Sequence, residues 1–144
     1  EINRFTNVVV RQSAVGDRDG TATFTCGSGT GTGHLSDDGG APVAICRLDS
    51  MVEEHGWPTH MKIDVEGAEL DVLRGAQGIL KRARPVLFLS THGEPIKQAC
   101  EEHLRRLGYI SHPVSMDPKF APELVCVHED HMQRSVAIPL RRAG

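Results

Sequence analysis

The chain has 144 residues, of which 39 % are hydrophobic and 24 % are charged. This composition fits one globular domain and excludes a collagen-like or broadly disordered protein. Sixteen basic and 19 acidic residues give a net charge of −3, which excludes the basic surface that nucleic acid binding requires.

The first half of the chain predicts strands around a long glycine-rich segment. Asn7–Val15 is rich in valine and is typical of a strand, and Gly16–Gly20 predicts a turn. Thr21–Thr25 would then return as the second arm of a hairpin. We expect a flexible loop over Cys26–Gly40, because its glycines do not match the G-x-G-x-x-G phosphate motif. Ala41–Cys46 predicts another short strand.

The second half alternates strands and helices, as in an α/β sheet with helices packed on it. The expected elements are a helix over Ser50–His55 capped by Asp49 and stopped by Gly56, a strand over Met61–Val65, a helix over Gly67–Ala83, a buried parallel strand over Val86–Ser90, a helix from Pro95 to Gly108, and strands over Tyr109–His112 and Leu124–His128. Gly75 and Gly78 predict a bend within the second of these helices.

Cysteines and histidines give no convincing metal motif. Cys26, Cys46, Cys100 and Cys126 are too widely spaced for a zinc site and lie in apolar stretches, so we expect reduced core thiols. The cluster His128–His131 lies in a polar stretch, and we expect no metal there. The apolar runs are too short to span a bilayer and no signal peptide is recognisable, so we expect a cytoplasmic protein without a membrane partner.

The most informative stretch runs from Lys62 to Glu69. On a strand, Lys62, Asp64 and Glu66 would point to one side, and the two carboxylates would stand at the strand's C-terminal end. Open α/β sheets bind their ligands in the crevice outside these ends. His92 follows the next strand and should reach the same edge. The sequence therefore predicts a crevice lined by Asp64, Glu66 and His92.

These residues also have a purely structural interpretation. Glu66 and Glu69 favour the N-terminus of the following helix, and Lys62 can pair with Asp64 or Glu66. His92 can be an ordinary loop histidine. The two interpretations differ in where they place the carboxylates: around a cleft, or locked in pairs with basic neighbours.

The stretch resembles the signature of FkbM-type S-adenosylmethionine-dependent methyltransferases. The resemblance lies in Lys62-Ile63-Asp64-Val65-Glu66-Gly67-Ala68-Glu69 and the following Val72-Leu73-Arg74-Gly75-Ala76. Weaker flanking similarities are Asn7–Gly20, Leu48-Asp49, Pro85–His92 and Gly108-Tyr109, so that the resemblance covers roughly residues 7–112.

The resemblance implies a class I, Rossmann-like methyltransferase fold, which is a doubly wound sheet with an antiparallel last strand. It implies S-adenosylmethionine as cofactor and methyl transfer to a hydroxyl of a small metabolite, sugar or polyketide. Asp64 is then the expected contact to cofactor or acceptor, His92 the general base, and Glu66 the residue that orients the acceptor. By fold analogy alone, Ser13 and Ala14 should approach the adenine.

The chain lacks two motifs of this family. One is the glycine-rich turn that holds the methionine end of the cofactor, and the other is the acidic residue that binds the ribose. Because the chain begins at Glu1 and not at Met, we expect both motifs upstream, which makes residues 1–144 a single partial domain without the first two strands and their helices. As an isolated polypeptide it should bind the cofactor poorly.

Such a gap would leave two unpaired sheet edges and exposed apolar helix faces. Three outcomes are open: the chain is part of a longer enzyme, which we favour, a second copy fills the gap and forms a homodimer, or Asn7–Val15 pairs directly with Met61–Val65.

Three functions are open from the sequence. The leading one is an O-methyltransferase with a small-molecule hydroxyl acceptor. The alternative from another class is a non-catalytic remnant that acts as a self-associating interaction module. The weakest is a metal-dependent hydrolase built on Asp64, Glu66 and His92, and we expect no metal at these residues.

Overall fold

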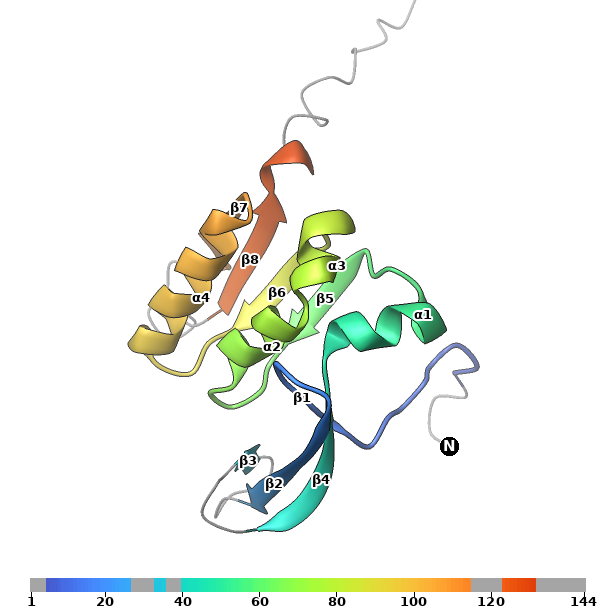
Figure 1. Ribbon diagram of the computed structural model, residues 1–144. Helices are drawn as coiled ribbons and strands as arrows, with labels where there is room; N and C mark the ends of the chain where they lie inside the picture. Colours follow the sequence, from blue (N-terminus) through green and yellow to red (C-terminus); the bar gives the residue numbers. More distant parts are fainter. Residues whose placement is uncertain (1–4, 27–32, 36–39, 115–122, 132–144) are drawn as a thin grey trace, which may run out of the picture.

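The computed structural model describes residues 5–26, 33–35, 40–114 and 123–131. These residues form two four-stranded sheets, with strand orders β1-β4-β2-β3 and β5-β6-β8-β7 (Figure 1). The first sheet consists of β1 (Ala14–Val15), β2 (Gly20–Cys26), β3 (Gly33–Leu35) and β4 (Ala41–Cys46). The second consists of β5 (His60–Ile63), β6 (Val86–Ser90), β7 (Tyr109–Pro113) and β8 (Glu123–His128). The helices are the 3-10 turn η1 (Leu48–Met51) and α1 (Val52–His55), α2 (Glu69–Gly75), α3 (Gln77–Arg82) and α4 (Glu94–Arg106).

The second sheet has the expected mixed topology. β5 and β6 run parallel, with Ile63 opposite Leu89. β8 lies between β6 and β7 and is antiparallel to both. This confirms the parallel strand pair and the antiparallel last strand. The α/β class is confirmed as well, and the chain is consistent with a Rossmann-like methyltransferase fold.

One face of the second sheet carries the core. α2, α3 and α4 all lie over this face (Figure 1). The buried apolar side chains come from alternate strand positions and from one stripe of each helix; they are Ile63, Val72, Leu73, Ala76, Ile79, Leu80, Leu87, Leu89, Cys100, Leu104, Tyr109, Leu124 and Cys126. Burial of each large aliphatic side chain stabilises the fold by about 1.5–3 kcal/mol. The opposite face leaves Phe88 42 % and Ile110 41 % exposed.

The helix expected over Gly67–Ala83 is divided at Ala76, which confirms the bend. Asp49 fixes the second piece, since its carboxylate accepts the backbone N–H of Gly78 at 2.7 Å and of Ile79 at 2.9 Å. The sequence predicted instead that Asp49 caps its own helix, and this was wrong because η1 and α1 have no side-chain cap. Gly56 ends α1 with a φ of 80°, as expected.

The first sheet differs from the prediction. Asn7–Val15 forms a strand only at Ala14–Val15, which pairs in parallel with β4. β2 pairs with β4 and β3 instead of returning along β1, so the predicted hairpin was wrong. The valine run has no strand partner among the described residues, and Val8, Val9 and Val10 are 60–88 % exposed.

Two further predictions concern the glycine-rich segment and the gap. Within Cys26–Gly40, Gly33–Leu35 forms β3, which was missed, and residues 27–32 and 36–39 lie outside the described residues. The described part of Asn7–Val15 does not pair with Met61–Val65, because β5 pairs with β6 alone in the described chain. β5 therefore keeps one open edge. Among the described helices, none has the length and apolar character needed to cross a membrane.

Candidate active site

The three side chains that the sequence predicted meet at one edge of the second sheet. β5 ends at Ile63 and β6 at Ser90, and their parallel direction brings the following residues to the same edge. There the Nε2 atom of His92 lies 3.9 Å from Asp64 Oδ1 and 3.6 Å from Glu66 Oε2. The structure therefore brings Asp64, Glu66 and His92 together.

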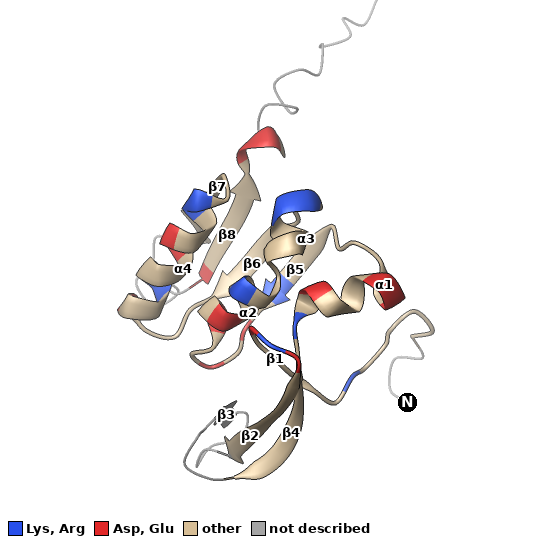
Figure 2. Ribbon diagram, viewed as in Figure 1, with Lys and Arg blue, Asp and Glu red and all other residues tan. Residues whose placement is uncertain are grey.

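A tight turn, and not a longer strand, delivers the two carboxylates. β5 stops before Asp64, so Lys62 is in the strand while Asp64 and Glu66 are in the turn. Glu66 has a φ of 45° and Gly67 a φ of 96°, both in the left-handed region, which is uncommon for a residue with a side chain. The reversal carries the chain directly into α2, and acidic positions follow β5 into the start of that helix (Figure 2).

A fourth residue, Glu69, completes the cluster. Its Oε1 atom lies 2.5 Å from Nδ1 of His92 and also accepts the backbone N–H of Gly67 at 3.1 Å. The Glu69 residue is completely buried. From the sequence, Glu69 was expected only to favour the N-terminus of the helix. Its spacing from Val72, Leu73 and Ala76 places it on the buried stripe of α2, and this was the signal that could have identified it.

The carboxylates change the protonation of the imidazole. The hydrogen bond to Glu69 is the main reason that the pKa of His92 is raised above its ordinary value. Partial burial opposes this change, and the negative charges of Glu66, Glu69 and Asp64 add to it. Because the ring keeps 35 % of its side chain exposed, it is accessible to a small molecule.

Lys62 joins the cluster to a polar network on the uncovered face of the sheet. Its Nζ atom lies 3.4 Å from Asp64 Oδ2 and 3.5 Å from Glu123 Oε2, and it donates a hydrogen bond to Ser90 Oγ. Ser90 in turn donates to Glu123 at 2.7 Å. The pairing of Lys62 with Asp64, which the structural interpretation expected, is thus present beside the convergence on His92. The Asp64 side chain remains 52 % exposed, and such ion pairs contribute only about 0–1 kcal/mol.

Ser13 and Ala14 do not join this cluster. Ser13 Oγ lies 3.6 Å from the Cys46 sulfur, and Ala14 pairs with Ile45 of β4. In the part of the chain that the structure describes, no hydrogen bond or ion pair links Ser13 or Ala14 to Asp64 or His92. Their approach to an adenine stays a prediction.

Among the described residues, no group of three His, Cys, Asp or Glu side chains is placed to hold a metal ion. The C-terminal histidines have structural contacts. His128 is buried edge-on against Tyr109 at 5.3 Å, and His131 Nε2 lies 2.8 Å from the carbonyl oxygen of Arg84. Cys46, Cys100 and Cys126 are free thiols.

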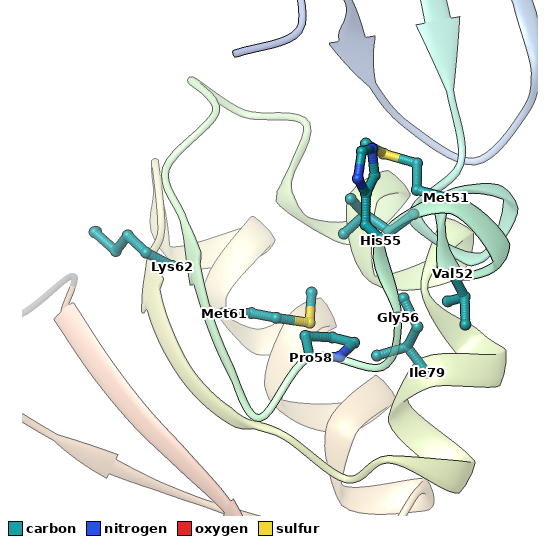
Figure 3. A pocket seen from close by; sticks show the side chains of 9 residues that line it. Met51, Val52, His55, Gly56, Pro58, Met61, Lys62 and Ile79 are labelled. Atoms are coloured by element: carbon teal, nitrogen blue, oxygen red, sulfur yellow. The ribbon is translucent and has the colours of Figure 1, made fainter. Parts of the chain in front are cut away.

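A separate hollow of about 300 Å³ lies beside β5 and α1 (Figure 3). Its lining is mainly apolar and consists of Leu48, Met51, Val52, His55, Gly56, Pro58, Met61, Lys62 and Ile79. The Lys62 side chain points away from the others (Figure 3). Asp64, Glu66 and His92 are not among the lining residues, so the polar cluster stands outside this hollow.

Comparison with known protein families identifies the family of this chain. The model of the methyltransferase FkbM domain matches residues 3–113, which is more than half of the chain and includes the cluster around His92. No significant match exists among curated proteins or among solved structures. The family model and the mixed α/β architecture agree with the resemblance seen in the sequence. The chain belongs to the FkbM methyltransferase family.

Proposed function

We propose that this protein is part of an S-adenosylmethionine-dependent O-methyltransferase that acts on a hydroxyl of a small metabolite, sugar or polyketide. Membership of the FkbM family supports methyl transfer. The observation that carries the proposal is the His92 ring, which is partly exposed at the sheet edge and surrounded by Asp64, Glu66 and Glu69. An alcohol oxygen becomes a better nucleophile as it loses its proton, and a histidine is a suitable acceptor of that proton.

Each residue has a distinct role in this proposal. Nε2 of His92 takes the proton of the acceptor hydroxyl, which requires the neutral imidazole. Asp64 and Glu66, with side chains 52 % and 42 % exposed, accept hydrogen bonds from hydroxyls of the acceptor and hold the reacting oxygen near His92. Lys62 keeps the Asp64 carboxylate in place through Oδ2, at 3.4 Å.

The cluster fits the acceptor side of the reaction. When bound, S-adenosylmethionine supplies a methyl group on a positively charged sulfur. The half-exposed carboxylates of Asp64 and Glu66 suit a neighbouring positive charge. Ser13 and Ala14 contact β4, and among the described residues they form no hydrogen bond or ion pair with the cluster. We propose that further strands of a longer chain pair with the open edge of β5 and hold the nucleoside.

The test uses the longest natural form of the protein. Release of S-adenosylhomocysteine is measured against a panel of small hydroxyl compounds for wild type, His92→Asn and Asp64→Asn. We expect the His92 variant to lose about 10²–10⁴-fold in kcat, the range for removal of a general base. Asp71→Asn is the matched control, because Asp71 pairs only with Arg74 on α2 among the described residues and should leave turnover unchanged. Full turnover in both site variants would contradict the proposal.

A self-associating, non-catalytic module is the second candidate. The open edge of β5 and the exposed Val8, Val9 and Val10 favour it, because unpaired edges and apolar runs promote pairing with a second copy. Sedimentation at increasing concentration tests it. A dimer that weakens in Val9→Lys, without cofactor binding by the longest form of the protein, would support this candidate, and a monomer at all concentrations would contradict it.

A further inference from the structure

The burial of Glu69 requires an explanation, because a carboxylate is costly to bury. It is 0 % exposed, and glutamate is almost never fully buried unless it is paired. Its Oε1 atom takes the hydrogen bonds of His92 Nδ1 and of the Gly67 backbone. Its Oε2 atom has no hydrogen-bond partner among the described residues. Burial of a charged group costs several kcal/mol, so the contacts at Oε1 must matter to the site.

The contact at Nδ1 decides the chemistry of the other ring nitrogen. A carboxylate accepts hydrogen bonds only, so Nδ1 must carry a proton to bond Glu69. In the neutral ring the lone pair is then at Nε2. Nε2 is the atom that lies 3.6 Å from Glu66 and 3.9 Å from Asp64.

The turn links this carboxylate to the strand end. Gly67, at a φ of 96°, donates its N–H to the Oε1 atom that also holds His92. The same carboxylate oxygen thus fixes the turn that presents Glu66 and the ring that faces it. A shift of Glu69 would move both partners of the reacting hydroxyl together.

We propose that Glu69 is the positioning residue of His92: its buried carboxylate holds the Nδ1 proton and directs the Nε2 lone pair towards the bound acceptor. The last part rests on the proposed function, whereas the orientation of the ring does not. Glu69 itself does not touch the acceptor, because its side chain is fully covered.

The charged groups that act on His92 come from the elements packed around it. Asp64, Glu66 and Glu69 face it from the turn and from α2, and all three are acidic. Lys62 pairs with Asp64 at 3.4 Å, and the negative charge of Glu69 also acts on the buried Cys100 of α4. Removal of the Glu69 charge therefore leaves two of the three carboxylates in place, and the pKa of His92 should fall only part of the way.

Long-range ¹H–¹⁵N NMR of histidine side chains tests the orientation without any substrate. In the wild type, neutral His92 should carry its proton on Nδ1. Glu69→Gln keeps the shape and removes the charge, so the pKa of His92 should fall by about one pH unit, at the low end of the range for a nearby carboxylate. Glu102→Gln is the control, because Glu102 pairs only with Arg105 and Arg106 on the surface of α4 among the described residues. It should leave the His92 titration unchanged.

Two results would overturn the proposal: a neutral wild-type ring protonated on Nε2, or an unchanged His92 pKa in a folded Glu69→Gln variant. The first needs no variant, so the test stays decisive even if the substitution unfolds the chain.

Kinetics separate this inference from the proposed function. Glu69→Gln should lower kcat by up to about 100-fold with little change in the KM of the acceptor, because a misplaced base affects the chemical step. If the wild type transfers no methyl group while NMR shows the Nδ1 proton, the proposed function fails and the positioning role stands. If the wild type is active and the ring is protonated on Nε2, the positioning role fails alone.

Discussion

Three carboxylates surround the single imidazole of His92 at the sheet edge, and this makes the charged ring a stabilising element of the fold. The hydrogen bond to Glu69, with the charges of Glu66, Glu69 and Asp64, raises the pKa of His92 in the folded state. In the unfolded chain this environment is absent. The folded state therefore binds the His92 proton more tightly, and stability depends on pH through this residue.

The sign of that dependence is fixed. The contribution of His92 is fully present below its unfolded-state pKa and is lost as pH rises through the raised folded-state pKa. We expect the difference in unfolding free energy between wild type and His92→Asn to shrink as pH rises across this window, measured by urea denaturation. The exposed Gln98→Ala, which changes no titratable group, serves as control and should keep a constant difference. A His92 difference that grows with pH would contradict the assignment.

Three of the four side chains in the cluster, Asp64, Glu66 and His92, were predictable from the sequence. Asp64 and His92 each follow an apolar strand, and parallel strands end at one edge of a sheet. Glu69 escaped prediction because an acid in the first turn of a helix already has a dipole explanation. Its contact with His92 depends on a turn whose left-handed Glu66 has no local signature in the sequence.

At the level of helices and strands, the start of α3 is capped by Asp49, which lies 29 residues before Gly78 in the sequence. Asp49 on η1 accepts the N–H groups of Gly78 and Ile79, which would otherwise lack partners at the start of the helix. Asp49→Ala should lower the unfolding free energy by about 1 kcal/mol. Asp71→Ala, whose exposed pair with Arg74 is worth a few tenths, is the control in the same chemical denaturation. Equal losses in the two variants would argue against the cap.

The contact between α2 and the end of β1 gives a second test. A Cβ atom added at Gly75 would overlap the carbonyl oxygen of Gly16. Alanine is about 1 kcal/mol better than glycine within a helix, but overpacking costs about 1–3 kcal/mol. We therefore expect Gly75→Ala to destabilise the fold by about 1 kcal/mol in thermal unfolding, whereas Gln77→Ala on the exposed side of α3 should change little. A stabilised Gly75 variant would mean that β1 does not pack there.

The same contact explains why the first sheet was hard to predict. Apolar patterns marked β2 and β4 correctly, but a pattern does not name the partner of a strand. Gly16 meets α2 and donates its N–H to the carbonyl of Cys46, which takes β1 to β4 and away from β2. Asn7 to Ser13 has strand composition but pairs with no strand among the described residues, so it stays outside the sheet. The second sheet was easier, because its helices and strands alternate with clear periods.

Across the whole molecule, buried residues are distributed unevenly between the two sheets. β6 and β8 carry fully buried residues such as Leu87, Leu89 and Cys126 under the helices. In β2 and β4, Ile45 is the buried residue among those whose burial is described.

Hydrogen exchange followed by mass spectrometry should therefore show β6 and β8 exchanging last, near the rate of global unfolding, and β2 and β4 exchanging much earlier. Peptides from α4, which packs on the same core, serve as an internal reference and should follow β6. Equal protection of the two sheets would mean that the chain unfolds as a single cooperative unit.

Tyr109 is the single tyrosine of the chain, and its ring is covered by the core with 3 % exposure. Its hydroxyl donates to the carbonyl oxygen of Leu80 at 3.4 Å, and desolvation raises the phenol pKa well above its ordinary value. Phenolate absorbance in alkali should therefore appear only when the helical layer lifts from the sheet. The absorbance of Tyr109 can therefore report the opening of the fold without a label or a ligand.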